Sequence, residues 1–153
     1  MTASATVPSS ALSIAPITDH DVAAVVTLWQ ACGLTRPWND PGADIALARR
    51  GPNSAVLVGR DGNAIVATAM VGHDGHRGWV YYVAVDPNRQ GKGLGRVIMA
   101  AVEDWLRAAG VPKLQLLVRR ENAKASAFYQ TLGYEESTSV MLAKWLDGRE
   151  PTP

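Results

Sequence analysis

The sequence contains one cysteine, Cys32, among its 153 residues. No disulfide can form within a single chain, so packing and hydrogen bonds must hold the fold, and a reducing compartment is compatible with it. Because Cys32 lies near the end of an apolar helical stripe, we expect it to pack as a small apolar side chain rather than to act as a nucleophile.

An excess of charge and long apolar runs are also missing. Net charge is only +1, with no large basic face, which argues against a nucleic-acid partner. No apolar run approaches the roughly 20 residues that span a bilayer. Residues 1–11 lack both the basic start and the apolar centre of a signal peptide. These absences predict a cytoplasmic protein with no membrane partner.

Apolar residues make up 47% of the chain and charged residues 19%, values typical of a globular domain. The length suits one domain. We expect that domain over residues 12–147, a disordered tail over residues 1–11 and a frayed tail over residues 148–153.

Apolar periodicity and turn signals predict a mixed α/β fold in the order β-α-α-β-β-β-α-β-α-β-β. The helices are expected at residues 22–32, 41–50, 94–109 and 123–132. The strands with assigned bounds are expected at residues 14–17, 55–59, 64–72, 79–85, 114–118 and 139–145. The helical crossover makes strands 79–85 and 114–118 parallel, and the other pairs should be largely antiparallel. The long helix should bury one face, composed of Leu94, Val97, Ala101 and Trp105.

Three glycines, Gly91, Gly93 and Gly95, lie where a predicted strand leads into the start of the long helix. They free the backbone to adopt positive φ, and the helix start supplies unpaired N–H groups and partial positive charge. This combination predicts a cradle for a phosphate or pyrophosphate. A Walker loop is excluded because Gly93, not Ser or Thr, follows Lys92, and a dinucleotide loop because Arg96 stands where the third glycine belongs. A nucleotide-binding regulator is therefore disfavoured.

The spacing that does fit is Q/R-x-x-G-x-G/A, met by Gln90, Gly93 and Gly95. It resembles the coenzyme A pyrophosphate loop of the GNAT N-acetyltransferases. A second stretch, N-x-x-A-x-x-x-Y from Asn122 to Tyr129 followed by Leu-Gly-Tyr, resembles that family's second signature.

The similarity extends from about residue 14 to residue 145. The stretches Arg36-Pro37-Trp38-Asn39-Asp40-Pro41 and Gly72-His73-Asp74-Gly75-His76-Arg77-Gly78 are similar to the bacterial YpeA-like group within the family.

The resemblance implies a centrally splayed mixed sheet and an acetyl-CoA-dependent N-acetyltransferase, in which a primary amine attacks directly in a ternary complex. Pyrophosphate is expected on the loop amides, the pantetheine arm on the central strand, and no metal is implied. The cofactor-binding residues are then Tyr82, Val83, Ala84, Val85, Gln90, Gly91, Lys92, Gly93, Leu94, Gly95, Arg96 and Asn122. Asn122 could equally cap the helix that follows it.

The second signature implies that Tyr129 is the general acid that protonates the leaving thiolate of CoA. The general base stays open. Leu117 stands where related enzymes carry a strand glutamate, which leaves His73, His76, Asp40 or a water chain to the tyrosines. The alternative function is therefore a non-catalytic CoA-binding regulatory module of the same fold.

Candidate substrate residues gather in two loops and on the central strand: Trp38, Asp40, His73, Asp74 and Tyr81. Acidic groups beside aromatic walls, with Asp44 on the same rim, suit a cationic amine. The acceptor could be a small molecule, a protein N-terminus or a lysine, and the protein a monomer or a homodimer.

Overall fold

The structure is a computed structural model that describes residues 12–151, so the predicted tail at residues 1–11 lies outside it. The chain divides into two compact units, one ending at Leu117 and the other beginning at Val118. The strands are β1 (Ser13–Pro16), β2 (Ser54–Asp61), β3 (Ala64–His73), β4 (Gly78–Val85) and β5 (Leu114–Gln115). The helices are α1 (Val22–Ala31), α2 (Pro41–Ala48), α3 (Leu94–Ala108) and α4 (Ala123–Thr131), with short 3-10 turns η2 (Asp19–Asp21) and η3 (Pro87–Arg89).

The first unit is built on a five-stranded sheet in the order β1-β2-β3-β4-β5. The first four strands pair antiparallel, whereas β4 and β5, joined through α3, pair parallel. The predicted mixed α/β fold is confirmed, as is the parallel pair flanking the long helix.

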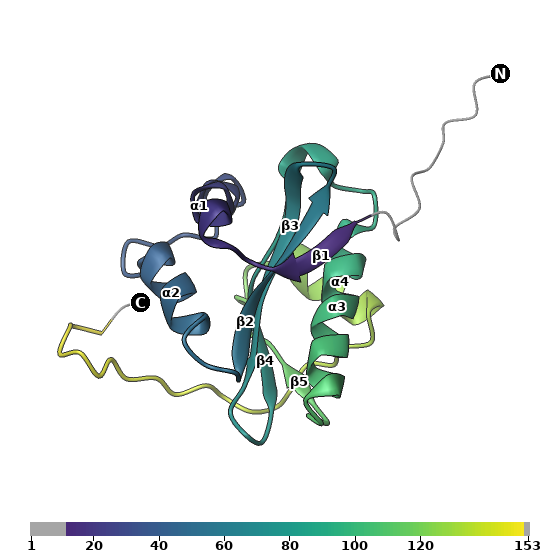
Figure 1. Ribbon diagram of the computed structural model, residues 1–153. Helices are drawn as coiled ribbons and strands as arrows, with labels where there is room; N and C mark the ends of the chain where they lie inside the picture. The colour runs from purple at the N-terminus through teal and green to yellow at the C-terminus, as the bar shows by residue number, and fades with distance from the viewer. Residues whose placement is uncertain (1–11, 152–153) are drawn as a thin grey trace. The chain divides into compact units, whose positions relative to one another are not determined.

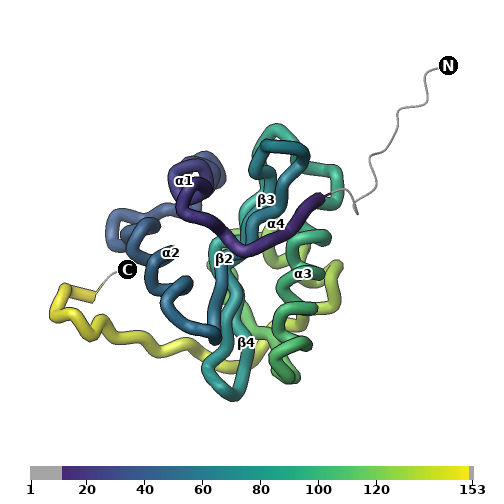
Figure 2. The backbone as a smooth tube through the Cα atoms, viewed as in Figure 1, coloured from purple at the N-terminus to yellow at the C-terminus, as the bar shows by residue number. Residues whose placement is uncertain are grey.

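Helices cover both faces of this sheet (Figure 1). Helices α1 and α2 lie on one face, and α3 lies on the other, packed against β3 and β4. The core under α1 and α2 centres on Trp29 and Ile45, which meet Val56 and Val58 of β2. The tube in Figure 2 shows the same layering.

Local signals set the helix starts much as the sequence predicts. Asp40 caps α2 by accepting a 3.1 Å hydrogen bond from the Ala43 amide, with Pro41 in the first turn. At the start of η2, which leads directly into α1, the Asp21 carboxylate accepts 2.9 Å hydrogen bonds from the amide and hydroxyl of Thr18, as in a capping box.

The buried face of α3 differs from the predicted one. Its buried residues are Ile98, Met99, Val102 and Leu106, while Leu94, Val97, Ala101 and Trp105 are only half-buried. Two adjacent apolar stripes run along this helix, and the stripe that contains Ile98 and Val102 is the one that packs on the sheet. Gly78 makes room for it, since a Cβ there would lie 2.5 Å from Leu106.

The second unit contains α4 and the chain that follows it. The prediction of two strands after α4, the last at residues 139–145, is wrong: no strand follows β5 in the described part of the chain. A strand requires a partner ladder, and residues 139–145 form none here, so Val140 is 77% exposed and Leu142 92% exposed. Strand β5 is likewise shorter than the predicted 114–118.

Candidate functional site

The glycine loop places two left-handed residues immediately before α3. Gly91 has φ of 80° and Gly93, the N-cap of α3, has φ of 77°. A Cβ added to either would meet no atom within 4 Å, so both face open space. No side chain caps α3 and no acidic residue lies in its first turn, which leaves the first amides and their partial positive charge available.

Of the three basic side chains around the loop, one forms an ion pair within the described part of the chain and two do not. The Arg89 guanidinium lies 2.5 Å from the Asp61 carboxylate. Lys92 and Arg96 are exposed and form no ion pair with any residue between 12 and 151. Open glycines, uncapped amides and two cations together fit a pyrophosphate, so the loop is chemically suited to hold CoA.

Strand β4 has a free edge beside this loop. It pairs with β5 only through Gly78 with Leu114 and Trp79 with Gln115. From Val80 to Val85, no described strand pairs with this edge. The predicted splay of the sheet is therefore present in the first unit, at the residues expected to receive a pantetheine arm.

A β-bulge interrupts the other edge of β4. Thr68 pairs with Ala84 but Met70 pairs with Tyr81, so β4 carries one extra residue opposite Ala69. Tyr82, within the bulge, has φ of 52° and is the one non-glycine residue with positive φ in the described chain. Such a conformation costs about 1–3 kcal/mol and persists only where surrounding contacts impose it.

The Tyr82 side chain is held between two helices. Its ring stacks on Trp29 of α1, and its hydroxyl donates a 2.6 Å hydrogen bond to Asp44 of α2. Burial, followed by the hydrogen bond to Asp44, raises the pKa of Tyr82 far above its usual range, with Asp40 adding to the effect. Tyr82 thus stays protonated at neutral pH and lies in the field of two carboxylates.

The candidate substrate residues fall into two groups. Asp40, at the start of α2, lies close enough to influence Tyr82, and half-buried Trp38 precedes it in the same loop. Tyr81, on β4, is 48% exposed, and partial burial raises the pKa of its hydroxyl.

His73 is the last residue of β3, and Asp74 begins the turn between β3 and β4. The Asp74 carboxylate accepts from the amides of His76 and Arg77, and these bonds lower its pKa, while its second oxygen accepts from the Trp79 indole at 3.4 Å. The His73 ring lies 6.3 Å from Trp105, near the end of α3. This turn therefore lies at the opposite end of β4 and α3 from the glycine loop (Figure 2).

In the second unit, Asn122 and Tyr129 lie at the two ends of α4. The Asn122 Oδ1 caps the helix by accepting a 3.1 Å bond from the Ala125 amide, and its side-chain NH₂ keeps two further donors. The Tyr129 ring makes edge-on contacts with Phe128 and Tyr134. Burial raises the pKa of Tyr129, which keeps its phenol protonated.

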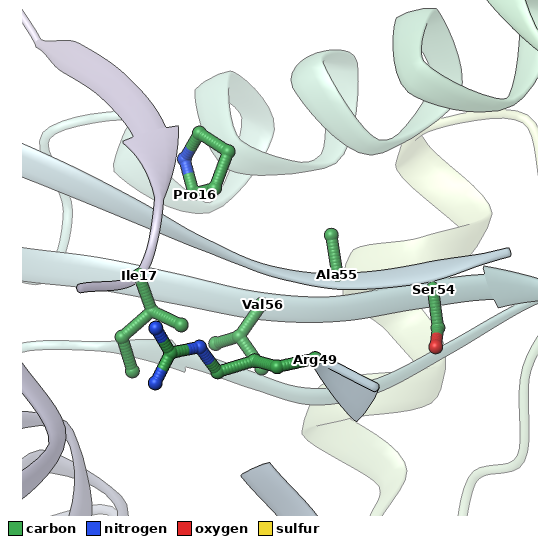
Figure 3. A pocket seen from close by; sticks show the side chains of 6 residues that line it. All are labelled: Pro16, Ile17, Arg49, Ser54, Ala55 and Val56. Carbon is green, nitrogen blue, oxygen red and sulfur yellow. The ribbon is translucent and has the colours of Figure 1, made fainter. Parts of the chain in front are cut away.

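A small pocket lies elsewhere in the first unit. Its volume is about 170 Å³, and Figure 3 shows its lining by Arg49, the end of β1 and the start of β2. None of the predicted site residues lines it, so it does not belong to the candidate site.

Cys32 contributes packing rather than chemistry. Its thiol donates a 3.3 Å hydrogen bond to the Val85 carbonyl, and burial raises its pKa, which disfavours the reactive thiolate. No three His, Cys, Asp or Glu side chains within residues 12–151 are arranged to hold a metal ion. None of the helices in that part combines the length and apolar character needed to cross a membrane.

Comparison with known proteins establishes the family of this chain. The sequence pattern of the Acetyltransferase (GNAT) family matches residues 22–134. The chain belongs to this family. Acetyltransferase YE1169 of Yersinia enterocolitica is 40% identical over 126 residues, which cover 82% of this chain and 89% of that protein. As a GNAT acetyltransferase, the chain has acetyl-CoA-dependent acetylation as its general class of reaction.

Solved structures share the GNAT fold. The ribosomal-protein-S18-alanine N-acetyltransferase from Escherichia coli matches with a TM-score of 0.71 at 27% identity, over 83% of this chain and 79% of that one. AAC(6')-Iy, solved with the bisubstrate analogue CoA-S-monomethyl-acetylneamine, matches with a TM-score of 0.75 at 16% identity, over 88% and 97%. These two enzymes act on different kinds of acceptor by name, so the shared fold leaves the acceptor of this chain open.

Proposed function

We propose that this protein transfers an acetyl group from acetyl-CoA to a primary amine by direct attack in a ternary complex. The observation that carries the proposal is the uncapped, glycine-flanked start of α3 beside the free edge of β4. The amides of residues 91–96, with Lys92 and Arg96, would hold the pyrophosphate, and residues 82–85 would pair with the pantetheine arm. Bound acetyl-CoA supplies the acetyl group as an activated thioester.

Tyr129 is proposed as the general acid. A thiolate that leaves during acyl transfer needs a proton, and a phenol can provide one. The raised pKa of Tyr129 keeps that proton in place throughout the neutral range. Asn122, with its spare amide donors, would hold the pantetheine arm.

The acceptor is proposed to enter between residues 36–41 and the β3–β4 turn. Asp40 and Asp44 place negative charge beside the Tyr82 hydroxyl, an environment that favours an ammonium group over a neutral or anionic acceptor. Exposed Tyr81 and half-buried Trp38 offer aromatic surface for the same cation. His73 and Asp74 would border the opening from the other side.

Release of the CoA thiol from acetyl-CoA tests the proposal. A panel of small polyamines, aminoglycosides, free amino acids and short peptides would be offered, with the thiol detected colorimetrically. Thiol release that depends on one class of amine supports the enzyme. Tight acetyl-CoA binding with no amine-dependent release would instead favour a non-catalytic CoA-binding module, for which the apolar Leu117 at the strand glutamate position argues.

A further inference from the structure

The strained backbone of Tyr82 is held by a chain of two hydrogen bonds that begins on another element. The Trp29 indole Nε1–H donates to the Thr68 hydroxyl at 2.8 Å, and that hydroxyl lies 3.1 Å from the Tyr82 carbonyl oxygen. Both Trp29 and Thr68 have 0% exposure. The contact therefore joins α1 to the bulge of β4 through the centre of β3.

The direction of these bonds is fixed by chemistry. An indole N–H can only donate, so the Thr68 oxygen must accept from Trp29. A carbonyl can only accept, so the single hydroxyl proton of Thr68 must go to Tyr82. Trp29 thereby orients the hydroxyl that holds the Tyr82 carbonyl.

Trp29 also contacts Tyr82 directly. The two rings stack with centroids 3.8 Å apart and 6° between their planes. Side chain and backbone of Tyr82 are thus held by the same tryptophan, once by stacking and once through Thr68. This double attachment explains how a tyrosine keeps a φ of 52°.

The bulge decides what the free edge of β4 presents. If Tyr82 returned to an ordinary strand conformation, the register of one end of β4 would slip by one residue against β3. A slip of one residue turns every side chain to the opposite face and exchanges the backbone groups that point outward. The orientation of residues 83–85 along the free edge therefore depends on the bulge.

We propose that Thr68 and Trp29 are positioning residues that fix the β4 bulge and so align the edge that receives the pantetheine arm of acetyl-CoA. The inference rests on the proposed function. In this proposal, two fully buried residues far from the glycine loop in sequence determine how the pantetheine half of acetyl-CoA binds. The glycine loop, which would hold the other half, owes its conformation to its own glycines and to α3.

The test compares Thr68→Val with Thr68→Ser by calorimetric titration. Two probes would be used: acetyl-CoA, and its nucleotide half, adenosine 3′-phosphate 5′-diphosphate, which has no pantetheine arm. Loss of one buried hydrogen bond corresponds to about a tenfold change in binding affinity. Thr68→Val should weaken acetyl-CoA binding about tenfold and leave the affinity for the nucleotide half unchanged. Thr68→Ser keeps the hydroxyl and should therefore bind acetyl-CoA with wild-type affinity.

Equally weakened binding of both probes, or no change in either affinity, would overturn the inference. A purely structural role of Thr68 predicts no difference between the two halves of the ligand. Should Thr68→Val fail to fold, Trp29→Phe removes the first donor and should give the same selective loss. If the wild-type protein binds neither probe, the proposed function fails and the inference fails with it. If the wild type binds both and the variants show no selectivity, the inference fails alone.

Discussion

The phenol of Tyr82 donates a 2.6 Å hydrogen bond to the carboxylate of Asp44, linking the middle of β4 to the first turn of α2. Through this contact the central strand and the acidic start of α2 share one small region of the first unit. The strand carries the free edge suited to CoA, and the helix carries the negative charge suited to an amine. Donor and acceptor sites are therefore expected to meet at Tyr82.

Gly93→Ala should weaken acetyl-CoA binding at least tenfold. A methyl group at this position would project into the open space that the pyrophosphate is proposed to occupy. The matched control is Gly110→Ala, because Gly110 follows the other end of α3, has φ of 76° and also faces open space. The two variants suffer similar backbone strain. Calorimetric titration should show a loss for Gly93→Ala alone, and equal affinities for the two variants would contradict the assignment.

Tyr129→Phe should lower turnover by roughly 10²–10⁴ while acetyl-CoA affinity stays within about twofold. The substitution keeps the ring contacts with Phe128 and Tyr134 and removes only the hydroxyl. Tyr134→Phe serves as the control, since it removes a hydroxyl from a ring in contact with Tyr129, and it should retain turnover. Near-normal turnover of Tyr129→Phe would show that solvent delivers the proton.

The pH profile follows from the direction of the Tyr129 shift. Because burial raises its pKa above the ordinary value of about 10, the protonated and active form persists throughout the neutral and mildly alkaline range. Wild-type turnover should therefore show no decline attributable to this proton below about pH 10. A decline in turnover near pH 8 that disappears in Tyr129→Phe would contradict the raised pKa of Tyr129.

Asp40→Asn should raise the KM of a cationic acceptor and leave the KM of acetyl-CoA nearly unchanged. Asparagine caps a helix as well as aspartate does, so α2 should keep its start while the charge disappears. Asp74→Asn, in the β3–β4 turn, provides the corresponding test on the other side of the proposed opening. Steady-state kinetics with both substrates varied would separate the two constants, and a selective loss for acetyl-CoA would reverse this assignment of the site.

The buried Asp21 should contribute stability that depends on pH. Its hydrogen bond to Arg60, at 2.5 Å, is the main cause that lowers its pKa. A lowered aspartate pKa adds stability above the ordinary value near 4 and loses it as pH falls through the folded-state value. Asp21→Asn should therefore cost about 1–3 kcal/mol at pH 7, and the difference from wild type should shrink as the pH falls below the ordinary aspartate pKa.

Urea unfolding at several pH values measures this difference. Asp19→Asn is the control, because the Asp19–Arg49 pair is exposed and should contribute less than about 1 kcal/mol. A constant effect of Asp21→Asn at all pH values would show that the ion pair is not responsible.

Local signals in the sequence were sufficient for most of the fold. Proline after Asp40, the Asp61-Gly62 turn and glycines at the start of α3 each act on a few neighbouring residues, and the corresponding elements are found within a few residues of the predicted bounds. The strand predicted at residues 139–145 failed because a strand depends on a partner, which apolar residues in sequence cannot specify.

The candidate site divides in the same way. The glycine loop is continuous in sequence and was predictable, whereas the support of Tyr82 joins residues 29, 44, 68 and 82 from four elements. Trp29 fits an apolar helical stripe, a pattern that predicts only a core residue. Thr68, a hydroxyl within an apolar strand, was the one signal of a buried polar contact, and the sequence did not reveal its partners.

A crystal structure with acetyl-CoA bound is the most direct test of the central claim, that the α3 start and the free edge of β4 together hold the acetyl donor. The account predicts the pyrophosphate within about 3 Å of the amides of residues 91–96, the pantetheine arm along residues 82–85, and the thioester within reach of the Tyr129 hydroxyl. A cofactor bound elsewhere, or a thioester remote from Tyr129, would contradict it.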